Sequence, residues 1–141
     1  MTARRSEKHL VQAAQARVER WRRVAREAAK QSRRSDVPVV EDVLSLKAAV
    51  RIRPAPPGLS LLLAEQERST TLFAAMQSAL QRSAMNNPSV YLAVGPEGGW
   101  TAEEEALFGS EGWQAVSLGP RILRAETAGI TAMAVVAAMF S

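Results

Sequence analysis

The sequence contains no cysteine and a single histidine among its 141 residues. Without cysteine the chain can form no disulfide, no thiolate metal site and no cysteine nucleophile, and this composition is typical of a cytoplasmic protein. The one histidine, His9, lies in an arginine-rich segment, where a solvated side chain is the simplest interpretation. A Ser-His-Asp arrangement is therefore not expected. No cluster of acidic and histidine residues has metal-ligand spacing, so we predict no metal site.

Long hydrophobic runs are also lacking. The longest apolar stretch, residues 128–140, is too short to cross a membrane, and the charged and polar residues 1–20 do not have the pattern of a signal peptide. Hydrophobic residues nevertheless make up 47% of the chain, which excludes a disordered protein. We therefore predict one globular domain over residues 1–141, large enough for a proper core and without a membrane partner.

Acidic residues are too few to balance the basic ones in the first quarter of the chain. Residues 1–36 contain 11 Lys and Arg against 4 Asp and Glu, whereas the rest contains 7 against 10. Apolar residues at helical spacing predict a helix over residues 7–34, with a stripe formed by Val11, Ala14, Val18, Trp21, Ala25 and Ala28. The opposite face carries Arg23, Arg26, Lys30 and Arg34. Such a face predicts a polyanionic partner, most simply nucleic acid; a merely solvated face is the alternative.

The remaining sequence alternates expected strands with expected helices. Strands are predicted at residues 37–40, 59–64, 91–94 and 115–118, and helices at residues 45–51, 69–82, 101–112 and 126–140. Ser69 is expected to cap the second of these helices, and Thr101 with Glu104 forms a capping box that starts the third. This alternation predicts the α/β class, with an open and mostly parallel sheet covered by helices on both faces.

Two of these helices have faces that indicate how they pack. The helix over residues 69–82 should turn Leu72, Phe73, Met76 and Leu80 inward. The final helix is small and apolar nearly all round, so it must be buried on several sides, by the chain's own sheet and by a second subunit. We predict a homodimer that uses the helix face formed by Thr131, Ala134, Val135 and Ala138.

Two of the expected strands end in glycine-containing loops that lead directly into helices. Gly95-Pro96-Glu97-Gly98-Gly99 follows the strand at 91–94, and Gly119–Arg124 follows the strand at 115–118. Glycine allows unusual backbone angles and a close approach of a ligand to the main chain. Loops at the carboxyl ends of sheet strands are the usual place for a ligand site, so we predict one pocket between them. The first loop matches neither a Walker A motif nor the dinucleotide fingerprint, and a plain glycine turn is the alternative.

Charged residues crowd the start of the final helix. Arg121, Arg124 and Glu126 follow a strand within a few residues. An arginine at a helix N-terminus opposes the helix dipole, and a residue placed against its local preference often has a functional task. Of the tryptophans, Trp21 fits a core position better than a base-stacking platform, whereas for Trp100, just after the first loop, both interpretations stay open.

These residues carry a resemblance to a known family. Gly95–Gly99, followed by Leu118–Ala128, resembles the bacterial 16S rRNA (uracil-N3) methyltransferase family RsmE, of the SPOUT superfamily. The stretches at residues 20–21, 27–34 and 37–38 are similar too, so the resemblance covers nearly all of the chain. It implies a C-terminal trefoil knot, a homodimer, the cofactor S-adenosylmethionine (SAM), and methylation of a uridine N3 in the 16S rRNA of the small ribosomal subunit.

The resemblance also implies roles for individual residues. SAM would be held by three loops, through Leu63, Ala64, Glu65, Gly95, Glu97, Gly98, Gly99, Leu118, Gly119, Arg121, Ile122 and Leu123. Arg124 and Glu126 lie where the second loop meets its helix, so from this position we expect them to face the pocket and carry the transfer step. Arg124 would hydrogen-bond the developing oxygen charge, and Glu126 would orient Arg124 or accept the proton. The alternative is that this pair only holds its loop in shape. RNA contacts would come from Arg23, Arg26, Lys30, Arg33 and Arg34.

The chain departs from the family pattern in two respects. Family members begin with a small β-barrel RNA-binding domain and with a first strand and helix of the knotted domain, and neither is found in this sequence. Arg33 stands where the family usually has glycine. A second hypothesis is therefore a truncated, non-catalytic module that dimerises and binds RNA.

Overall fold

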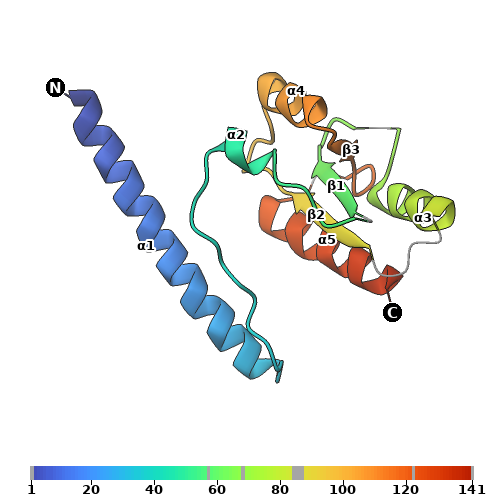
Figure 1. Ribbon diagram of the computed structural model, residues 1–141, viewed down its shortest axis with the longest axis horizontal. Coiled ribbons are helices and arrows are strands. Elements are labelled where there is room, and N and C mark those ends of the chain that lie inside the picture. The colour runs from blue at the N-terminus through green and yellow to red at the C-terminus, as the bar shows by residue number, and fades with distance from the viewer. Residues whose placement is uncertain (1, 57, 68, 84–87, 122, 141) are drawn as a thin grey trace. The chain divides into compact units, whose positions relative to one another are not determined.

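The computed structural model describes residues 2–56, 58–67, 69–83, 88–121 and 123–140. The chain divides into two units, Met1–Ser45 and Leu46–Ser141. The first unit contains one long helix, and the second contains the sheet and the shorter helices (Figure 1). The expected single domain thus consists of two units, which are described separately.

The first unit is dominated by helix α1 (Thr2–Gln31), which confirms the predicted helix and extends it toward the N-terminus. Two backbone hydrogen bonds close its end: Arg33 N–H donates to Lys30 C=O at 3.2 Å, and Arg34 N–H donates to Ala29 C=O at 3.0 Å. Arg33 has a φ of +55°, the left-handed conformation that usually selects glycine. The end of α1 is therefore a Schellman cap in which arginine occupies the glycine position.

Residues 37–40 do not form the predicted strand. Pro38 has no N–H to donate to a ladder, and the described part of this unit offers no second strand with which the segment could pair. The segment is held instead by Arg22 of α1. Its Nε donates to the Val40 carbonyl and its Nη2 to Asp42 Oδ1, both at 2.9 Å.

The covered side of α1 also differs from the prediction. Val18 and Ala29 are buried, but the side chains of Val11 and Trp21 are 58% and 55% exposed. The extended segment is bonded to α1 through Arg22 and not at the predicted stripe. Trp21 is therefore not a core residue, which corrects the sequence-based interpretation.

The sheet of the second unit has three parallel strands in the order β2-β1-β3. Central strand β1 (Gly58–Leu63) pairs with β2 (Ser89–Ala93) up to Leu62↔Ala93, and with β3 (Gln114–Val116) up to Leu63↔Val116. These strands confirm three of the four predicted ones and the predicted parallel arrangement.

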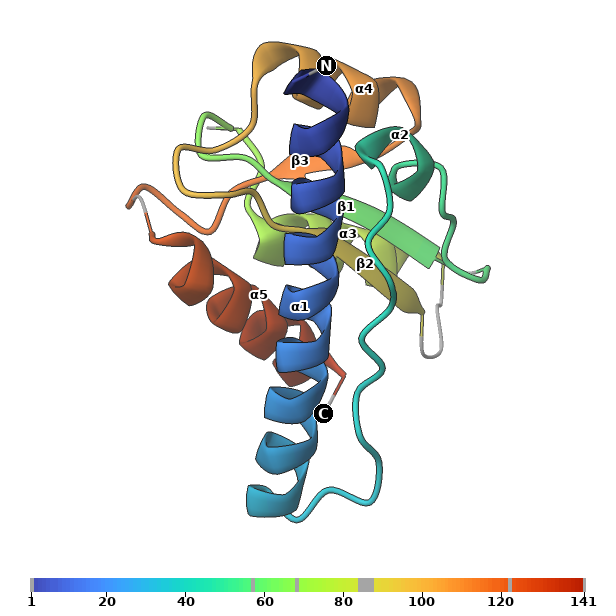
Figure 2. The same cartoon turned by 90° about the vertical axis from the view of Figure 1, so that its left-hand side faces the viewer.

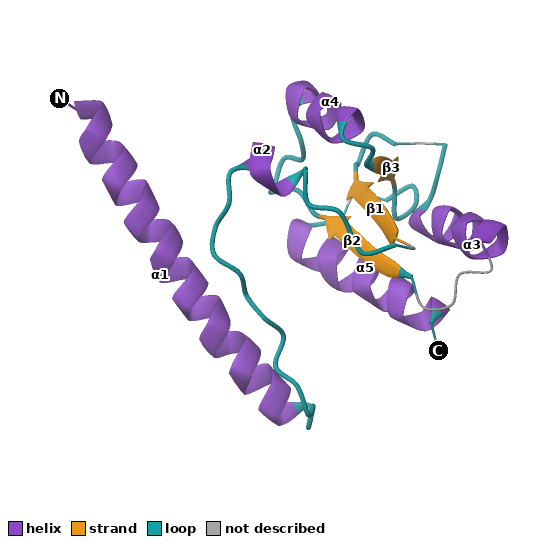
Figure 3. Cartoon of the chain, in the orientation of Figure 1, coloured by secondary structure: helices purple, strands orange, loops and turns teal. Residues whose placement is uncertain are grey.

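Helices cover both faces of the sheet, as predicted (Figures 2 and 3). Leu61 and Leu63 of β1 pack with α3 (Leu72–Ser83) and α5 (Ala125–Met139), whereas Leu62, on the other face, packs with Val50 and Phe108. Phe108 belongs to α4 (Ala102–Ser110), and Val50 follows the short helix α2 (Leu46–Ala49). Alternate residues of β1 thus serve two cores, because successive side chains of a strand point to opposite faces.

Helix α3 begins at Leu72, two residues later than it would if Ser69 were its cap. Thr71 Oγ1 accepts a hydrogen bond from Ala74 N–H at 3.1 Å, whereas Ser69 donates to the Glu67 carboxylate. Leu72 and Met76 are buried as predicted, but Phe73 is 55% exposed. Capping by Ser69 and an inward Phe73 were wrong: Thr71 takes the cap position, and the buried face of α3 consists of Leu72, Ala75, Met76 and Ala79.

Helix α5 keeps an exposed apolar face. Ala132 and Val136 are buried and Val135 packs against the same core, whereas Ile130 is 73% and Met133 63% exposed. Val135, predicted to face a second subunit, therefore points toward the chain's own core. Ala134 and Ala138, also predicted for that face, are exposed. Within the described residues, no helix has both the length and the hydropathy needed to span a membrane.

Candidate functional site

The carboxyl ends of the three strands lead into loops that surround one cavity of about 620 Å³. One loop follows β1 at Leu63–Glu65, one follows β2 at Val94–Gly99, and one follows β3 at Ser117–Arg124. Ala125 and Ala128 of α5 complete the lining. This volume is in the range of small-molecule sites, and the carboxyl edge of a parallel sheet is where such sites form.

Most residues predicted to bind a cofactor line this cavity. They are Leu63, Ala64, Glu65, Gly95, Glu97, Gly98, Gly99, Leu118, Gly119, Arg121 and Leu123. The remaining one, Ile122, lies outside the described residues. Sequence reasoning missed Val94, Pro96, Val116, Ser117, Pro120, Ala125 and Ala128, which also line the cavity. Their position beside the predicted residues on the same loops was the available signal.

Two glycines of the glycine-rich loop, Gly98 and Gly99, are needed for backbone conformation. Gly98 and Gly99 have φ values of +97° and +77°, in the left-handed region. A Cβ placed on Gly98 would meet no atom within 4 Å, so crowding does not explain this glycine. Gly99 N–H donates to Pro96 C=O at 3.0 Å and closes the turn. The plain-turn alternative and the ligand-site hypothesis thus describe the same loop, a tight turn whose main chain borders a cavity.

Backbone hydrogen bonds join the loops after β1 and β3. Ala64 N–H donates to Val116 C=O at 2.9 Å, and Leu72 N–H donates to Ser117 C=O at 2.8 Å. Ser117 N–H in turn donates to Thr70 C=O at 3.0 Å. The cavity walls formed by these loops are therefore fixed by main-chain contacts.

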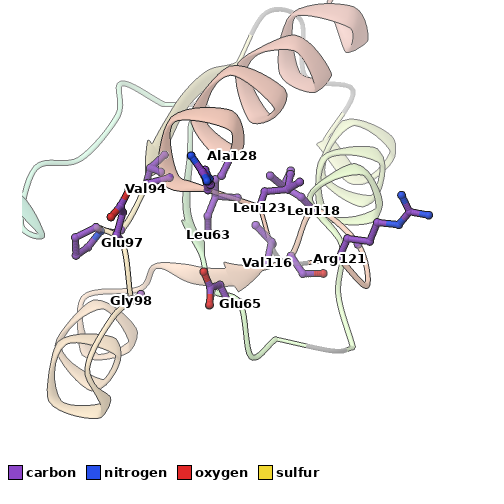
Figure 4. Close-up of a pocket in the computed structure, with 18 of the residues that line it drawn as sticks. Leu63, Glu65, Val94, Glu97, Gly98, Val116, Leu118, Arg121, Leu123 and Ala128 are labelled. Carbon is purple, nitrogen blue, oxygen red and sulfur yellow. The ribbon is translucent and has the colours of Figure 1, made fainter.

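Apolar and charged side chains are segregated around the cavity. Leu63, Val116 and Leu123 lie at its centre, while Glu97 on one side and Arg121 on the other mark its borders (Figure 4). Figure 4 shows Arg121 extending outward, away from the central residues. The cavity thus has an apolar floor with charged groups at its rim, an arrangement suited to a ligand that is partly apolar and partly charged.

Only one residue of the predicted catalytic pair, Arg124, lines the cavity. Arg124 lines the cavity and is the N-cap residue of α5, with φ −61° and ψ 151° and no side-chain capping bond. Glu126, one of the described residues that do not line the cavity, is exposed in the first turn of α5. The structure therefore brings Arg124, and not Glu126, to the site.

The basic residues predicted to contact RNA are all exposed in the first unit. Lys30 lies 3.3 Å from Glu27 and Arg34 lies 3.4 Å from Asp36, so these two cations have carboxylate partners. Arg23, Arg26 and Arg33 form no salt bridge with any residue in the described ranges. Among the described residues no group of His, Cys, Asp and Glu could hold a metal ion.

Comparison with known proteins gives the class of this chain. A family model described as an RNA methyltransferase domain matches residues 1–137, so the chain belongs to the RNA methyltransferase domain family. It is similar to ribosomal RNA small subunit methyltransferase E of Synechocystis sp., with 39% identity over 135 residues that cover 95% of this chain and 43% of the relative. The same enzyme of Mycobacterium tuberculosis is 38% identical over 123 residues, 86% of this chain and 45% of the relative. The chain thus spans less than half the length of these relatives.

Solved structures agree with this assignment. The crystal structure of ribosomal RNA small subunit methyltransferase E from Neisseria gonorrhoeae bound to SAM matches with a TM-score of 0.69 and 32% identity, over 89% of this chain and 48% of that one. A Legionella pneumophila protein in complex with SAM matches with a TM-score of 0.73 and 29% identity, over 91% of this chain and 48% of that one. The resemblance found in the two loop motifs is therefore confirmed.

Proposed function

We propose that this chain is the SAM-binding part of an RNA methyltransferase that acts on the N3 of a uridine in 16S rRNA. The observation that carries the proposal is the cavity of about 620 Å³ bounded by three strand-end loops. The chain has this cavity and belongs to a family in which similar proteins are solved with SAM.

The residues around the cavity fit SAM chemically. Leu118 and Leu123, which line the cavity and are only partly buried, offer apolar surface for an adenine ring, and the glycine loop exposes main-chain groups that can hydrogen-bond its polar edge. Glu65 and Glu97 are carboxylates that complement a positively charged ligand. When bound, SAM supplies an electrophilic methyl group on a sulfonium sulfur.

Arg124 is the residue we propose for the chemical step. N3 gives up its proton to water, and the negative charge that is left spreads onto the neighbouring uracil oxygens. N3 then forms the N–C bond as the methyl C–S bond breaks, which releases S-adenosylhomocysteine. A guanidinium at the cavity wall can donate hydrogen bonds to such an oxygen, and it cannot itself serve as the base. The position of Glu126 outside the lining favours the role of orienting Arg124 over direct proton transfer.

RNA binding is proposed for the first unit. Arg23, Arg26, Lys30, Arg33 and Arg34 can each neutralise a phosphate. Arg23, Arg26 and Arg33 would contribute most because the described structure gives them no carboxylate partner. The 16S rRNA in the small ribosomal subunit, and hence the cytoplasm, is the proposed setting.

A homodimer and the trefoil knot are further parts of the proposal. The dimer is supported by the exposed apolar face of α5, with Ile130 and Met133 at its centre. The knot rests on the resemblance of the two loop motifs to the SPOUT superfamily. Light scattering that reported a stable monomer at micromolar concentration would contradict the dimer.

Calorimetry with S-adenosylhomocysteine tests the cofactor site. We expect one site per chain and loss of binding in Gly98→Val, because a β-branched residue does not tolerate the left-handed conformation of Gly98. Unchanged binding in that variant would remove the glycine loop from the site.

A methyl-transfer assay on 30S subunits, with a full-length family member as positive control, separates the enzyme from the rival hypothesis. That rival is a non-catalytic module that dimerises and binds RNA. RNA binding without transfer would establish it.

A further inference from the structure

The carboxyl end of β1 is paired differently on its two sides. Toward β3 the ladder reaches Leu63↔Val116, and Ala64 N–H then donates to Val116 C=O at 2.9 Å. Toward β2 the ladder ends one residue earlier, at Leu62↔Ala93. The Leu63 C=O and the Ala64 N–H belong to one trans peptide unit and point in opposite directions. The Leu63 carbonyl therefore faces the β2 side, beyond the last paired residue of β2.

Trp100 supplies the hydrogen-bond donor at this position. Its indole Nε1 donates to the Leu63 carbonyl at 3.0 Å, across 37 residues of sequence. Leu63 opens one cavity loop, and Trp100 directly follows the glycine loop that ends at Gly99. One side chain thus joins two of the three walls of the cavity. Trp100 is not among the described residues that line the cavity, so it acts from behind the wall.

The same indole fixes the first residue of the glycine loop. A Cβ on Gly95 would lie 3.1 Å from both Cε2 and Nε1 of Trp100, closer than ordinary van der Waals contact. Gly95 is not among the glycines with positive φ, in contrast to Gly98 and Gly99. Close approach of the indole, and not backbone conformation, therefore explains the glycine at position 95.

The indole is itself held in place by an aromatic cluster. Trp100 packs edge-on against Phe108, with ring centroids 4.9 Å apart, and Phe108 packs edge-on against Trp113 at 5.2 Å. Phe108 is only 3% exposed. At the far end of the cluster, Trp113 Nε1 donates to the Val50 carbonyl at 2.8 Å. Trp100 is thus fixed by ring packing on one side and by its hydrogen bond on the other.

We propose that Trp100 is a positioning residue for the cofactor cavity, holding the Gly95–Gly99 loop at a fixed distance from the carboxyl end of β1. This inference rests on the proposed function, since it assumes that the cavity binds SAM. Without the indole bond, the Leu63 carbonyl loses its donor and the glycine loop loses its contact to the central strand. The main-chain groups of that loop are then less well ordered for a ligand.

Trp113 provides a matched control. Trp100→Phe and Trp113→Phe each keep a ring in the same aromatic cluster and each remove one partly buried indole donor to a backbone carbonyl. We expect both variants to lose similar thermal stability. Trp100→Phe should in addition weaken S-adenosylhomocysteine binding about fivefold, the size of one neutral hydrogen bond. Trp113→Phe should bind as the unmodified chain does.

The outcomes distinguish this inference from the proposed function. If the unmodified chain binds S-adenosylhomocysteine and the two Phe variants bind equally well, the positioning role of Trp100 is wrong while the site stands. If the unmodified chain does not bind, the proposed function fails and the inference with it.

Gly95→Ala tests the same contact without changing Trp100. Its Cβ should push the loop away from the indole and weaken binding, and unchanged affinity in the folded variant would overturn the inference. Because Phe is smaller than Trp, Gly95→Ala should cost less affinity in the Trp100→Phe background than alone. Effects that simply multiply would show that the two residues act independently, against the proposal.

Discussion

Helices α4 and α5, which follow the cavity loops after β2 and β3, begin in opposite ways. At α4, Thr101 Oγ1 accepts a hydrogen bond from Glu104 N–H at 3.2 Å, and Glu104 Oε2 accepts one from Thr101 N–H at 2.9 Å. At α5, the N-cap position is held by Arg124, which makes no side-chain capping bond. Both helices follow a parallel strand and a glycine-containing loop on the same cavity.

This difference suggests that the two loops have different roles. The capping box satisfies backbone donors at the start of α4 from within the chain, so the first loop is locally stable. Arg124 satisfies none at the start of α5, and its positive charge opposes the helix dipole. A position that breaks the local rule without a structural gain is expected at a functional site. We therefore expect the loop before α4 to shape the cavity and the loop before α5 to offer the Arg124 side chain to the substrate.

The largest effect is expected for Arg124→Ala. If Arg124 stabilises charge that develops in the transition state, its loss should lower turnover about a hundredfold or more, the usual cost of one such donor. Affinity for S-adenosylhomocysteine and thermal stability should be unchanged. Steady-state kinetics together with calorimetry would measure both quantities.

A variant that unfolds or no longer binds the cofactor product would show that Arg124 has a structural role. Arg121→Ala is the matched control, because Arg121 comes from the same loop but extends away from the centre of the cavity (Figure 4). It should lose much less turnover than Arg124→Ala.

Thr101→Ala should have the opposite profile. Loss of the N-cap hydroxyl should destabilise the second unit by about 1 kcal/mol, measured by denaturant unfolding. Turnover per folded molecule should stay within about twofold, since the capping box does not contact the cavity. Stability equal to that of the unmodified chain would mean that the box contributes nothing to α4.

Arg124→Ser should make the two helix starts alike. Serine is a preferred N-cap and removes the opposed charge, so stability should rise by about 0.5 to 1 kcal/mol while turnover falls as in Arg124→Ala. A fall in stability would contradict the view that Arg124 is held there against local preference.

The smallest effect is expected at Arg33, a second residue that stands against its local conformational preference. Arg33 occupies the left-handed position of the α1 cap at φ +55°, so Arg33→Gly should stabilise the end of α1 by about 0.5 kcal/mol. The same change should weaken RNA binding and flatten its salt dependence if Arg33 contacts phosphate. Greater stability with unaltered RNA affinity would leave this arginine without a binding role.

Local sequence signals were sufficient to predict much of the structure of the second unit. Glycines at strand ends and the Thr101–Glu104 spacing act within a few residues, so the loops and the start of α4 followed from sequence directly. The cavity itself followed because parallel strands bring their carboxyl ends to one edge.

The features that sequence analysis failed to predict depend on interactions between residues far apart in the chain. The hydrogen bond from Trp100 to Leu63 spans 37 residues, and that from Arg22 to Val40 spans 18. A local sequence pattern therefore predicts neither of them. Trp21 was expected in a core because its spacing is apolar, yet the segment that approaches α1 bonds to its neighbour Arg22. Whether residues 37–40 form a strand depended on a pairing partner, which a single segment of sequence does not reveal.

The place of β1 in the sheet has a consequence for how the chain is made. The central strand is synthesised before both of its neighbours, so its consecutive buried residues Leu61, Leu62 and Leu63 have no strand to pair with until β2 and then β3 leave the ribosome. At usual translation rates, the roughly fifty residues between β1 and β3 take about 3 to 10 seconds to appear. During that interval the strand lacks its hydrogen-bonded neighbours, and an unpaired strand edge of this kind makes a nascent chain prone to aggregation.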